Sequence, residues 1–161
     1  MFVHDDVLIS DLFWAERVRD GLGQFDVVGV AGNRRRAAGQ PGWVMVDLDG
    51  RLEAPEHLSG AIGQGDTFPP ERVDVFGPSG QACRLLDGVF LAADSRMLHR
   101  TGLRFDERFT FDFYDLDLCR SAEVLGLSMG TIPLSLVHAS LGTLDGDWHE
   151  AYRRYLAKWE T

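Results

Sequence analysis

The sequence has few cysteines, few basic residues and no long apolar run. Among its 161 residues are only two cysteines, Cys83 and Cys119, which make neither a disulfide framework nor a metal-ligand spacing. We therefore expect a reducing compartment and a cytoplasmic location. No basic stretch followed by an apolar run begins the chain, and no apolar stretch approaches the roughly 18 residues of a membrane span. Membrane association stays open.

Positive charge is also scarce. The 16 Lys and Arg residues are outnumbered by 25 Asp and Glu, which gives a formal charge of −9. Such a chain offers no broad surface for a phosphate backbone, so we expect no nucleic-acid partner. An anionic ligand needs local help from a divalent metal, a helix N-terminus or the run 34–36, which is Arg-Arg-Arg. This run predicts a solvated loop, with a phosphate or anionic-acceptor site as the alternative.

The composition and patterning predict one soluble α/β domain over residues 1–161. Hydrophobic residues make up 45% and charged residues 25%, which is typical of a globular protein. We expect helices at 10–22 (capped by Ser10), 95–101, 114–125 and 145–159, strands at 25–31, 43–48, 51–54, 73–77, 82–86, 89–93 and 127–137, and an irregular connector at 55–71. Because strands alternate with helices along the whole length, this pattern indicates a mixed sheet flanked by helices.

The stretch 105–126 crowds acids and aromatics around a predicted helix. Asp112 suits the N-cap, Asp115 follows three residues later like the acid of a capping box, and Gly126 suits the C-terminal stop. Acids in a first helical turn stabilise a helix by roughly 0.3–1 kcal/mol each and need no chemistry. Periodicity alone favours this structural interpretation.

Five segments in order carry a family resemblance. They are HDDV at 4–7, LDGVFLAADSRML at 86–98, LRFDERFTFDFYDLDLCRSAEVLG at 103–126, a strand ending in His138, and a tryptophan-bearing C-terminal helix. Together they resemble glycosyltransferase family 2, and more narrowly its small glycosyltransferase-like branch. The resemblance implies a GT-A fold, a nucleotide-diphospho-sugar transferase in which a Rossmann-like half precedes an acceptor half. Since the acidic metal motif falls at residues 4–6 here, we expect the nucleotide-binding half to be missing from the N-terminus.

The resemblance assigns roles to four residues on the donor side and at the reaction centre. Asp6 and His138 correspond to residues that bind the divalent metal or approach it, and Asp5 to an acid that faces the donor ribose or phosphate. Hard Mg²⁺ or Mn²⁺ takes oxygen ligands and neutralises a diphosphate leaving group, and the imidazole slightly favours Mn²⁺. Asp115 corresponds to the general base that deprotonates the acceptor hydroxyl in an inverting displacement.

Acceptor contacts are implied for five residues, namely Asp87, Gly88, Tyr114, Asp117 and Arg120. Tyr114 departs from the glutamate usual in the family. Helical spacing alone does not decide between Asp115 and Asp117 as the base, because positions two apart face differently. The remaining histidines, at 4, 57, 99 and 149, are expected to have no functional role. The aromatic stripe Trp148, Tyr152, Tyr155 and Trp159 predicts a packing or docking face.

Three functions follow from these assignments. The first is an inverting, metal-dependent transfer of a sugar from a nucleotide-sugar donor to a saccharide or other hydroxyl acceptor. The second is a binding or assembly module, a catalytically incomplete transferase that pairs with itself or with a partner chain through an open sheet edge. The third is a metal-dependent phosphoesterase that uses the same acids.

Overall fold

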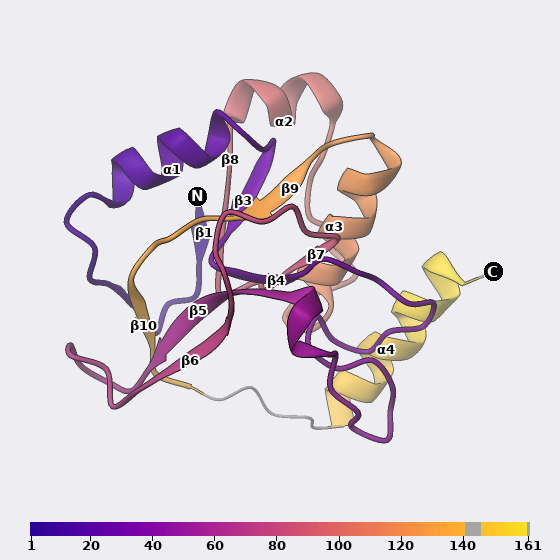
Figure 1. Ribbon diagram of the computed structural model, residues 1–161. Helices are drawn as coiled ribbons and strands as arrows, with labels where there is room; N and C mark the ends of the chain where they lie inside the picture. Colours follow the sequence, from indigo (N-terminus) through magenta and orange to yellow (C-terminus); the bar gives the residue numbers. More distant parts are fainter. Residues whose placement is uncertain (141–145, 161) are drawn as a thin grey trace.

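Short strands from the whole chain gather into two mixed β-sheets, with α-helices packed around them (Figure 1). The computed structural model describes residues 1–140 and 146–160. The first sheet has the order β1 (Phe2–Val3), β8 (Phe90–Ala93), β3 (Val27–Gly29) and β9 (Met129–Thr131). The second has the order β2 (Val7–Ile9), β10 (Leu136–His138), β5 (Leu58–Gln64), β4 (Ala31–Asn33) and β7 (Leu85–Leu86), and β6 (Arg72–Gly77) also pairs with β5.

Each sheet contains both parallel and antiparallel pairs. In the first, β3 runs antiparallel to β8 and parallel to β9; in the second, β10 runs antiparallel to β2 and parallel to β5. The helices of the described residues are α1 (Trp14–Leu22), α2 (Ser95–Thr101), α3 (Tyr114–Val124), α4 (Gly146–Trp159) and the short 3-10 helix η1 (Pro55–His57). The predicted α/β class with a mixed sheet is therefore confirmed. No helix in the described part of the chain is both long and apolar enough to cross a bilayer.

Strand β5 corrects the sequence prediction of an irregular connector at 55–71. It has seven residues and pairs with β10, β4 and β6, so it lies in the middle of the second sheet. A Cβ at Gly60, where φ is +96°, would lie 1.9 Å from the carbonyl oxygen of Val30, and one at Gly63 would lie 2.7 Å from that of Leu136. Only glycine fits at these two positions, because any side chain would overlap a neighbouring carbonyl oxygen. The glycines interrupt the alternation of polar and apolar side chains by which a strand is recognised in a sequence.

Other predicted strands also differ from the structure. The run 127–137 is divided into β9 of the first sheet and β10 of the second. The run 25–31 is split into β3 and β4, because the chain leaves the first sheet and enters the second at Val30. The predicted hairpin at 43–54 is reduced to one bridge between Met45 and Leu52, closed by a turn in which Gly50 has φ +79°.

Helix α1 begins at Trp14, four residues after the predicted cap. The hydroxyl of Ser10 donates to the carbonyl oxygen of Ser135, and Asp11 accepts from the backbone N–H of Phe13. Since both side chains serve a turn outside the helix, the prediction of Ser10 as the N-cap is wrong. Helix α2, in contrast, is capped by Asp94, which accepts from the N–H of Met97.

Helix α3 has the predicted span but not the predicted cap. Its N-cap is Phe113, whose φ of +63° is unusual for a residue with a side chain, and no side chain caps the first turn. The Phe113 ring is buried against Trp148, Tyr152 and Tyr155 of α4, at centroid distances of 5.2–5.5 Å. This packing offsets the backbone strain. The aromatic stripe of α4 therefore fills the core, and its interpretation as a docking face is wrong.

Candidate metal centre and acidic cleft

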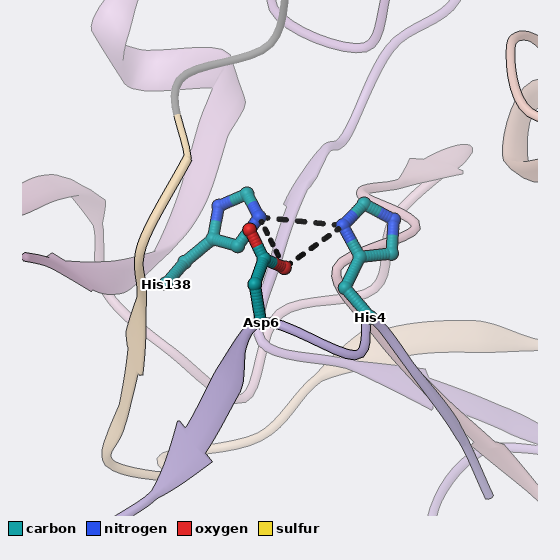
Figure 2. Close-up of side chains that lie close together, drawn as sticks. All are labelled: His4, Asp6 and His138. Atoms are coloured by element: carbon teal, nitrogen blue, oxygen red, sulfur yellow. Dashed lines mark hydrogen bonds and ion pairs between the residues drawn. The ribbon is translucent and has the colours of Figure 1, made fainter. Parts of the chain in front are cut away.

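Three side chains meet where β1, β2 and β10 end. Figure 2 shows His4 and Asp6, which lie in the turn between β1 and β2, facing His138 at the end of β10. Nδ1 of His4 lies 3.3 Å from Nε2 of His138, and Oδ1 of Asp6 lies 3.3 Å from Nε2 of His138 and 4.0 Å from Nδ1 of His4. All three ligand atoms lie within 4.8 Å of one another, so the group could hold a metal ion.

Strand pairing brings these residues together. The antiparallel register of β10 with β2 places His138 opposite Val7, one residue after Asp6. Ser140 then fixes the carboxylate, because its hydroxyl and its N–H donate to Oδ2 of Asp6 at 2.6 and 3.2 Å. The hydrogen bond from the Ser140 hydroxyl, together with the nearby His138, lowers the pKa of Asp6. A carboxylate that stays ionised is a suitable metal ligand.

The donor set fits a divalent transition-metal ion better than Mg²⁺. Two imidazole nitrogens and one carboxylate oxygen suit Mn²⁺, Fe²⁺ or Zn²⁺ better than Mg²⁺, which prefers oxygen ligands only. Asp6 and His138 were predicted as ligands, and His4, which was expected to have no functional role, lies in the same group. Asp5 is exposed in the same turn and does not belong to the group.

Beside the three ligands lies a cleft of about 430 Å³. Its polar lining includes His4, His138, Ser140, Asp87, Gly88, Tyr114 and Asp115. Its apolar lining includes Trp43, Met45, Leu52, Phe76, Phe111 and Trp148. The predicted metal ligands Asp6 and His138 and the predicted base Asp115 thus lie in this cleft or at its edge. Three of the five predicted acceptor residues, Asp87, Gly88 and Tyr114, also line it.

Asp115 lies in the cleft with an unusual ionisation. Burial, and secondly the charge of Asp87, raise the pKa of Asp115 to about 7. The N–H groups of Leu116 and Gly88 donate to its two oxygens at 2.8 and 3.1 Å and partly oppose this rise. These bonds also replace the capping box predicted for Asp115. Burial raises the pKa of Asp87 as well, so the cleft holds a coupled pair of carboxyl groups.

Tyr114 contacts His4 of the candidate metal centre and lines the same cleft as Asp87 and Asp115. Its hydroxyl lies 2.7 Å from Nε2 of His4, and burial raises its pKa, so the hydroxyl keeps its proton at neutral pH. A Cβ at Gly88 would lie only 2.0 Å from the Tyr114 hydroxyl oxygen. Gly88 therefore makes room for the tyrosine and also holds Asp115 through its N–H.

Asp117 and Arg120 lie outside the cleft, which corrects their prediction as acceptor-binding residues. Asp117 is fully buried, and its Oδ1 lies 2.8 Å from Nε1 of Trp159 and 2.7 Å from Nζ of Lys158. The Arg120 guanidinium lies 4.8 Å from the centroid of the Trp159 ring. Both residues join α3 to α4, because positions two and five residues after Asp115 lie on other faces of the helix.

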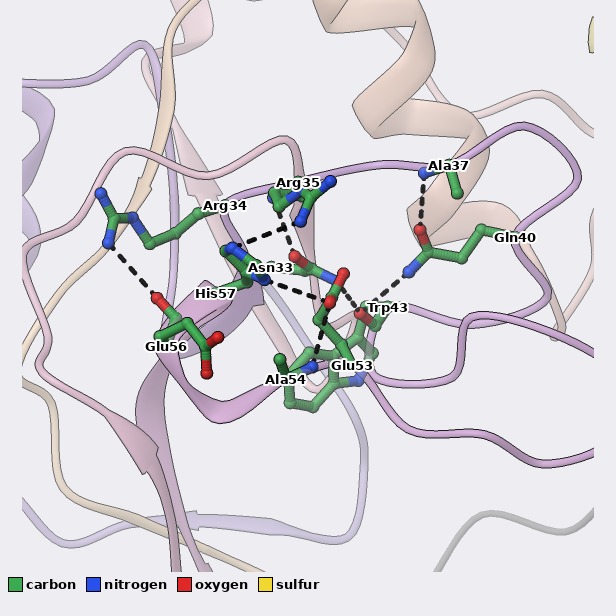
Figure 3. A network of polar contacts seen from close by, with 10 residues as sticks. All are labelled: Asn33, Arg34, Arg35, Ala37, Gln40, Trp43, Glu53, Ala54, Glu56 and His57. Atoms are coloured by element: carbon green, nitrogen blue, oxygen red, sulfur yellow. Dashed lines mark hydrogen bonds and ion pairs between the residues drawn. The ribbon is translucent and has the colours of Figure 1, made fainter.

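The wall that carries Trp43 is held by a buried polar network (Figure 3). The side-chain amides of Asn33 and Gln40 donate to the carbonyl oxygen of Trp43 at 2.9 and 3.2 Å, and Gln40 accepts from the N–H of Ala37 at 2.9 Å. Asn33 and Gln40 are almost completely buried. Since buried polar groups with satisfied hydrogen bonds fix a unique backbone path, the network sets the position of the Trp43 ring, which packs edge-on against Phe76.

No model of a known protein family matches the chain, and no curated protein matches its sequence.

Proposed function

We propose that this chain carries the metal and acceptor sites of an inverting glycosyltransferase with the GT-A fold, of the family 2 type. One observation supports this most: a group of two histidines and one aspartate borders the same cleft as a carboxyl group whose pKa is about 7. Metal-dependent sugar transfer needs both, since a cation, when bound, stabilises the diphosphate leaving group while a base takes up a proton.

Asp115 is the proposed general base. A base works best when its pKa lies close to the working pH, and a pKa of about 7 leaves about half of the carboxyl groups ionised at neutrality. An acceptor hydroxyl hydrogen-bonded to the ionised carboxylate gives up its proton as its oxygen attacks the anomeric carbon of the donor. Asp87, which raises the pKa of Asp115, tunes this base.

His4, Asp6 and His138 are the proposed metal ligands, and Mn²⁺ is the proposed ion. Tyr114 acts behind them, because its hydroxyl bonds His4 and fixes which nitrogen of the ring faces the other two ligands. Asp5 lies exposed beside the group and is proposed to contact the donor.

A saccharide is the proposed acceptor class. The lining of the cleft combines carboxyl groups, which can bind hydroxyls, with aromatic rings, among them Trp43 and Phe111. A largely apolar lining with a small number of polar groups is typical of a site for a small molecule.

Thermal unfolding with Mn²⁺ and UDP or GDP tests the proposal. We expect a rise in the melting temperature that needs metal and nucleotide together, and that is lost in His138→Ala. His99→Ala provides a matched control, because His99 lies on α2 away from the cleft. Stabilisation by Fe²⁺ or Zn²⁺ alone, with no nucleotide effect under any metal, would refute sugar transfer and point to another metal chemistry.

A second candidate is a binding or assembly module. The observation that favours it is strand β1, which pairs only with β8 among the described strands and carries the half-exposed Phe2. Edge strands with apolar side chains tend to pair with other chains. Analytical ultracentrifugation distinguishes the two: a stable dimer without any nucleotide effect supports the module.

A further inference from the structure

A second cavity, of about 360 Å³, is lined only by charged residues, and nearly all of them are positive. Its lining consists of Arg34, Arg35, Arg36, Arg84 and Glu123. Four guanidinium groups therefore face one carboxylate, in a chain whose formal charge is −9. Such a local excess of positive charge runs against the overall balance and requires an explanation.

The fold forces these arginines together. Strands β4 and β7 pair antiparallel with Asn33 opposite Leu85, and the N–H of Arg84 donates to the carbonyl oxygen of Asn33 at 2.7 Å. Continued by one residue, this register sets Arg34 opposite Arg84. Like charges directly opposite each other on neighbouring strands destabilise a sheet.

The one carboxylate of the cavity does not balance this charge. Oε2 of Glu123 lies 3.1 Å from Nε of Arg36, and Oε1 pairs with Arg84, so both oxygens are occupied. The side-chain contacts of Arg34 and Arg35 are not to carboxylates: Arg34 donates to the carbonyl oxygen of Glu56, and Nη1 of Arg35 lies 3.4 Å from Nε2 of His57. Neither has a carboxylate partner among residues 1–140 and 146–160.

We propose that this cavity binds a phosphorylated ligand with at least two negative charges. Guanidinium groups form paired, charge-assisted hydrogen bonds with phosphate oxygens, and several of them converge here from two strand ends. The site is separate from the acidic cleft: Glu123 lies eight residues after Asp115 on α3, which corresponds to about 12 Å along the helix. The proposal does not depend on sugar transfer.

The phosphate groups can belong to a soluble molecule or to a lipid headgroup. Isothermal titration with sodium diphosphate at low salt, in the presence of a chelator that keeps the metal group empty, probes the first. Co-sedimentation with phosphatidylcholine vesicles with and without phosphatidic acid probes the second. Binding of diphosphate assigns a soluble ligand, and binding of the acidic vesicles alone assigns a headgroup.

Three variants make the test specific. Arg34→Gln/Arg84→Gln removes two exposed guanidinium groups, and we expect it to weaken binding by at least about tenfold, because charge-assisted hydrogen bonds to the phosphate oxygens are lost. Glu123→Gln removes the competing carboxylate and is expected to strengthen binding. Arg51→Gln is the matched control, because Arg51 pairs with Asp47 outside the cavity.

Melting temperatures of all variants check that the fold is kept. Failure of the wild type to bind either diphosphate or acidic vesicles would overturn the proposal. So would equal affinity of the double variant and the wild type. An effect of Arg51→Gln as large as that of the double variant would show general charge attraction and would likewise overturn it.

Discussion

Replacing Asp115 by asparagine tests whether the pKa of Asp115 is raised, because a raised pKa makes the free energy of unfolding depend on pH. Burial raises the pKa of Asp115 to about 7, from an ordinary value of 3.8. Between these values the folded chain holds a proton that the unfolded chain has lost. The stability that this proton contributes is fully present below pH 3.8 and is lost as the pH rises through about 7. Asparagine does not titrate, so the variant escapes this loss.

The magnitude follows from the size of the pKa shift. A shift of about three units corresponds to about 4 kcal/mol in total, of which about 2 kcal/mol falls between pH 5.5 and pH 8. Asparagine accepts only one of the two N–H bonds from Gly88 and Leu116, which costs about 1–3 kcal/mol at every pH. The informative quantity is therefore the change with pH of the stability difference between variant and wild type. Because Asp87 is coupled to Asp115, this change belongs to the pair.

Urea unfolding followed by circular dichroism, at several pH values from 5.5 to 8 and with a chelator present, measures this difference. We expect the variant to gain about 2 kcal/mol relative to the wild type across that range. Asp49→Asn, in an exposed turn, controls for the loss of one negative charge. Parallel curves for Asp115→Asn and the wild type would refute a raised pKa and, with it, the proposed base. In a transfer assay the same variant should lose about 10²–10⁴-fold in rate.

Three further substitutions test separate parts of the structure. His4→Ala should lower Mn²⁺ affinity by at least about tenfold in a calorimetric titration, since even residues behind a metal ligand contribute that much; unchanged affinity would remove His4 from the site. Gly60→Ala should destabilise the chain by about 3 kcal/mol or more in urea unfolding, because its Cβ would overlap the carbonyl oxygen of Val30; a loss below about 1 kcal/mol would contradict the placing of β5. Lys158→Ala should cost about 3–5 kcal/mol, because it leaves the buried carboxylate of Asp117 without its cation; a melting temperature equal to that of the wild type would show that this pair does not stabilise the contact of α3 with α4.

Much of the fold could be predicted from the sequence where side chains carry the signal. Helix α2 has the predicted span 95–101, and Gly126, the predicted stop, follows the end of α3 in a left-handed conformation. The signal fails where tertiary contacts decide the backbone. Strand β5 was missed because Gly60 and Gly63 are required by the close approach of carbonyl oxygens from other parts of the chain. Such contacts leave no pattern in the local sequence.

The site was predicted in part, and the errors have a physical cause. Asp6, His138 and Asp115 were singled out by their resemblance to a family, and the structure brings them to one region. His4 was missed because the turn between β1 and β2, closed by the bond from the N–H of Val7 to the carbonyl oxygen of His4, brings it beside Asp6, and no residue pattern marks this turn. Asp117 was included wrongly, because a charged residue on a helix says nothing by itself about which face is covered by another helix.

The two kinds of carboxyl group in this region are suited to different tasks because their surroundings differ. Asp6 receives hydrogen bonds from Ser140 beside His138, so its pKa is lowered and it stays ionised, as a metal ligand must. Asp115 lies among buried groups next to a second carboxyl, so its pKa rises to about 7 and it can exchange a proton at neutral pH. Environments that drive the pKa values of neighbouring acids apart divide ligand from base in enzymes. The difference between the two acids arises here from ordinary features: a serine after β10 donates to Asp6, whereas at Asp115 burial and the neighbouring Asp87 outweigh the two N–H groups that donate to it.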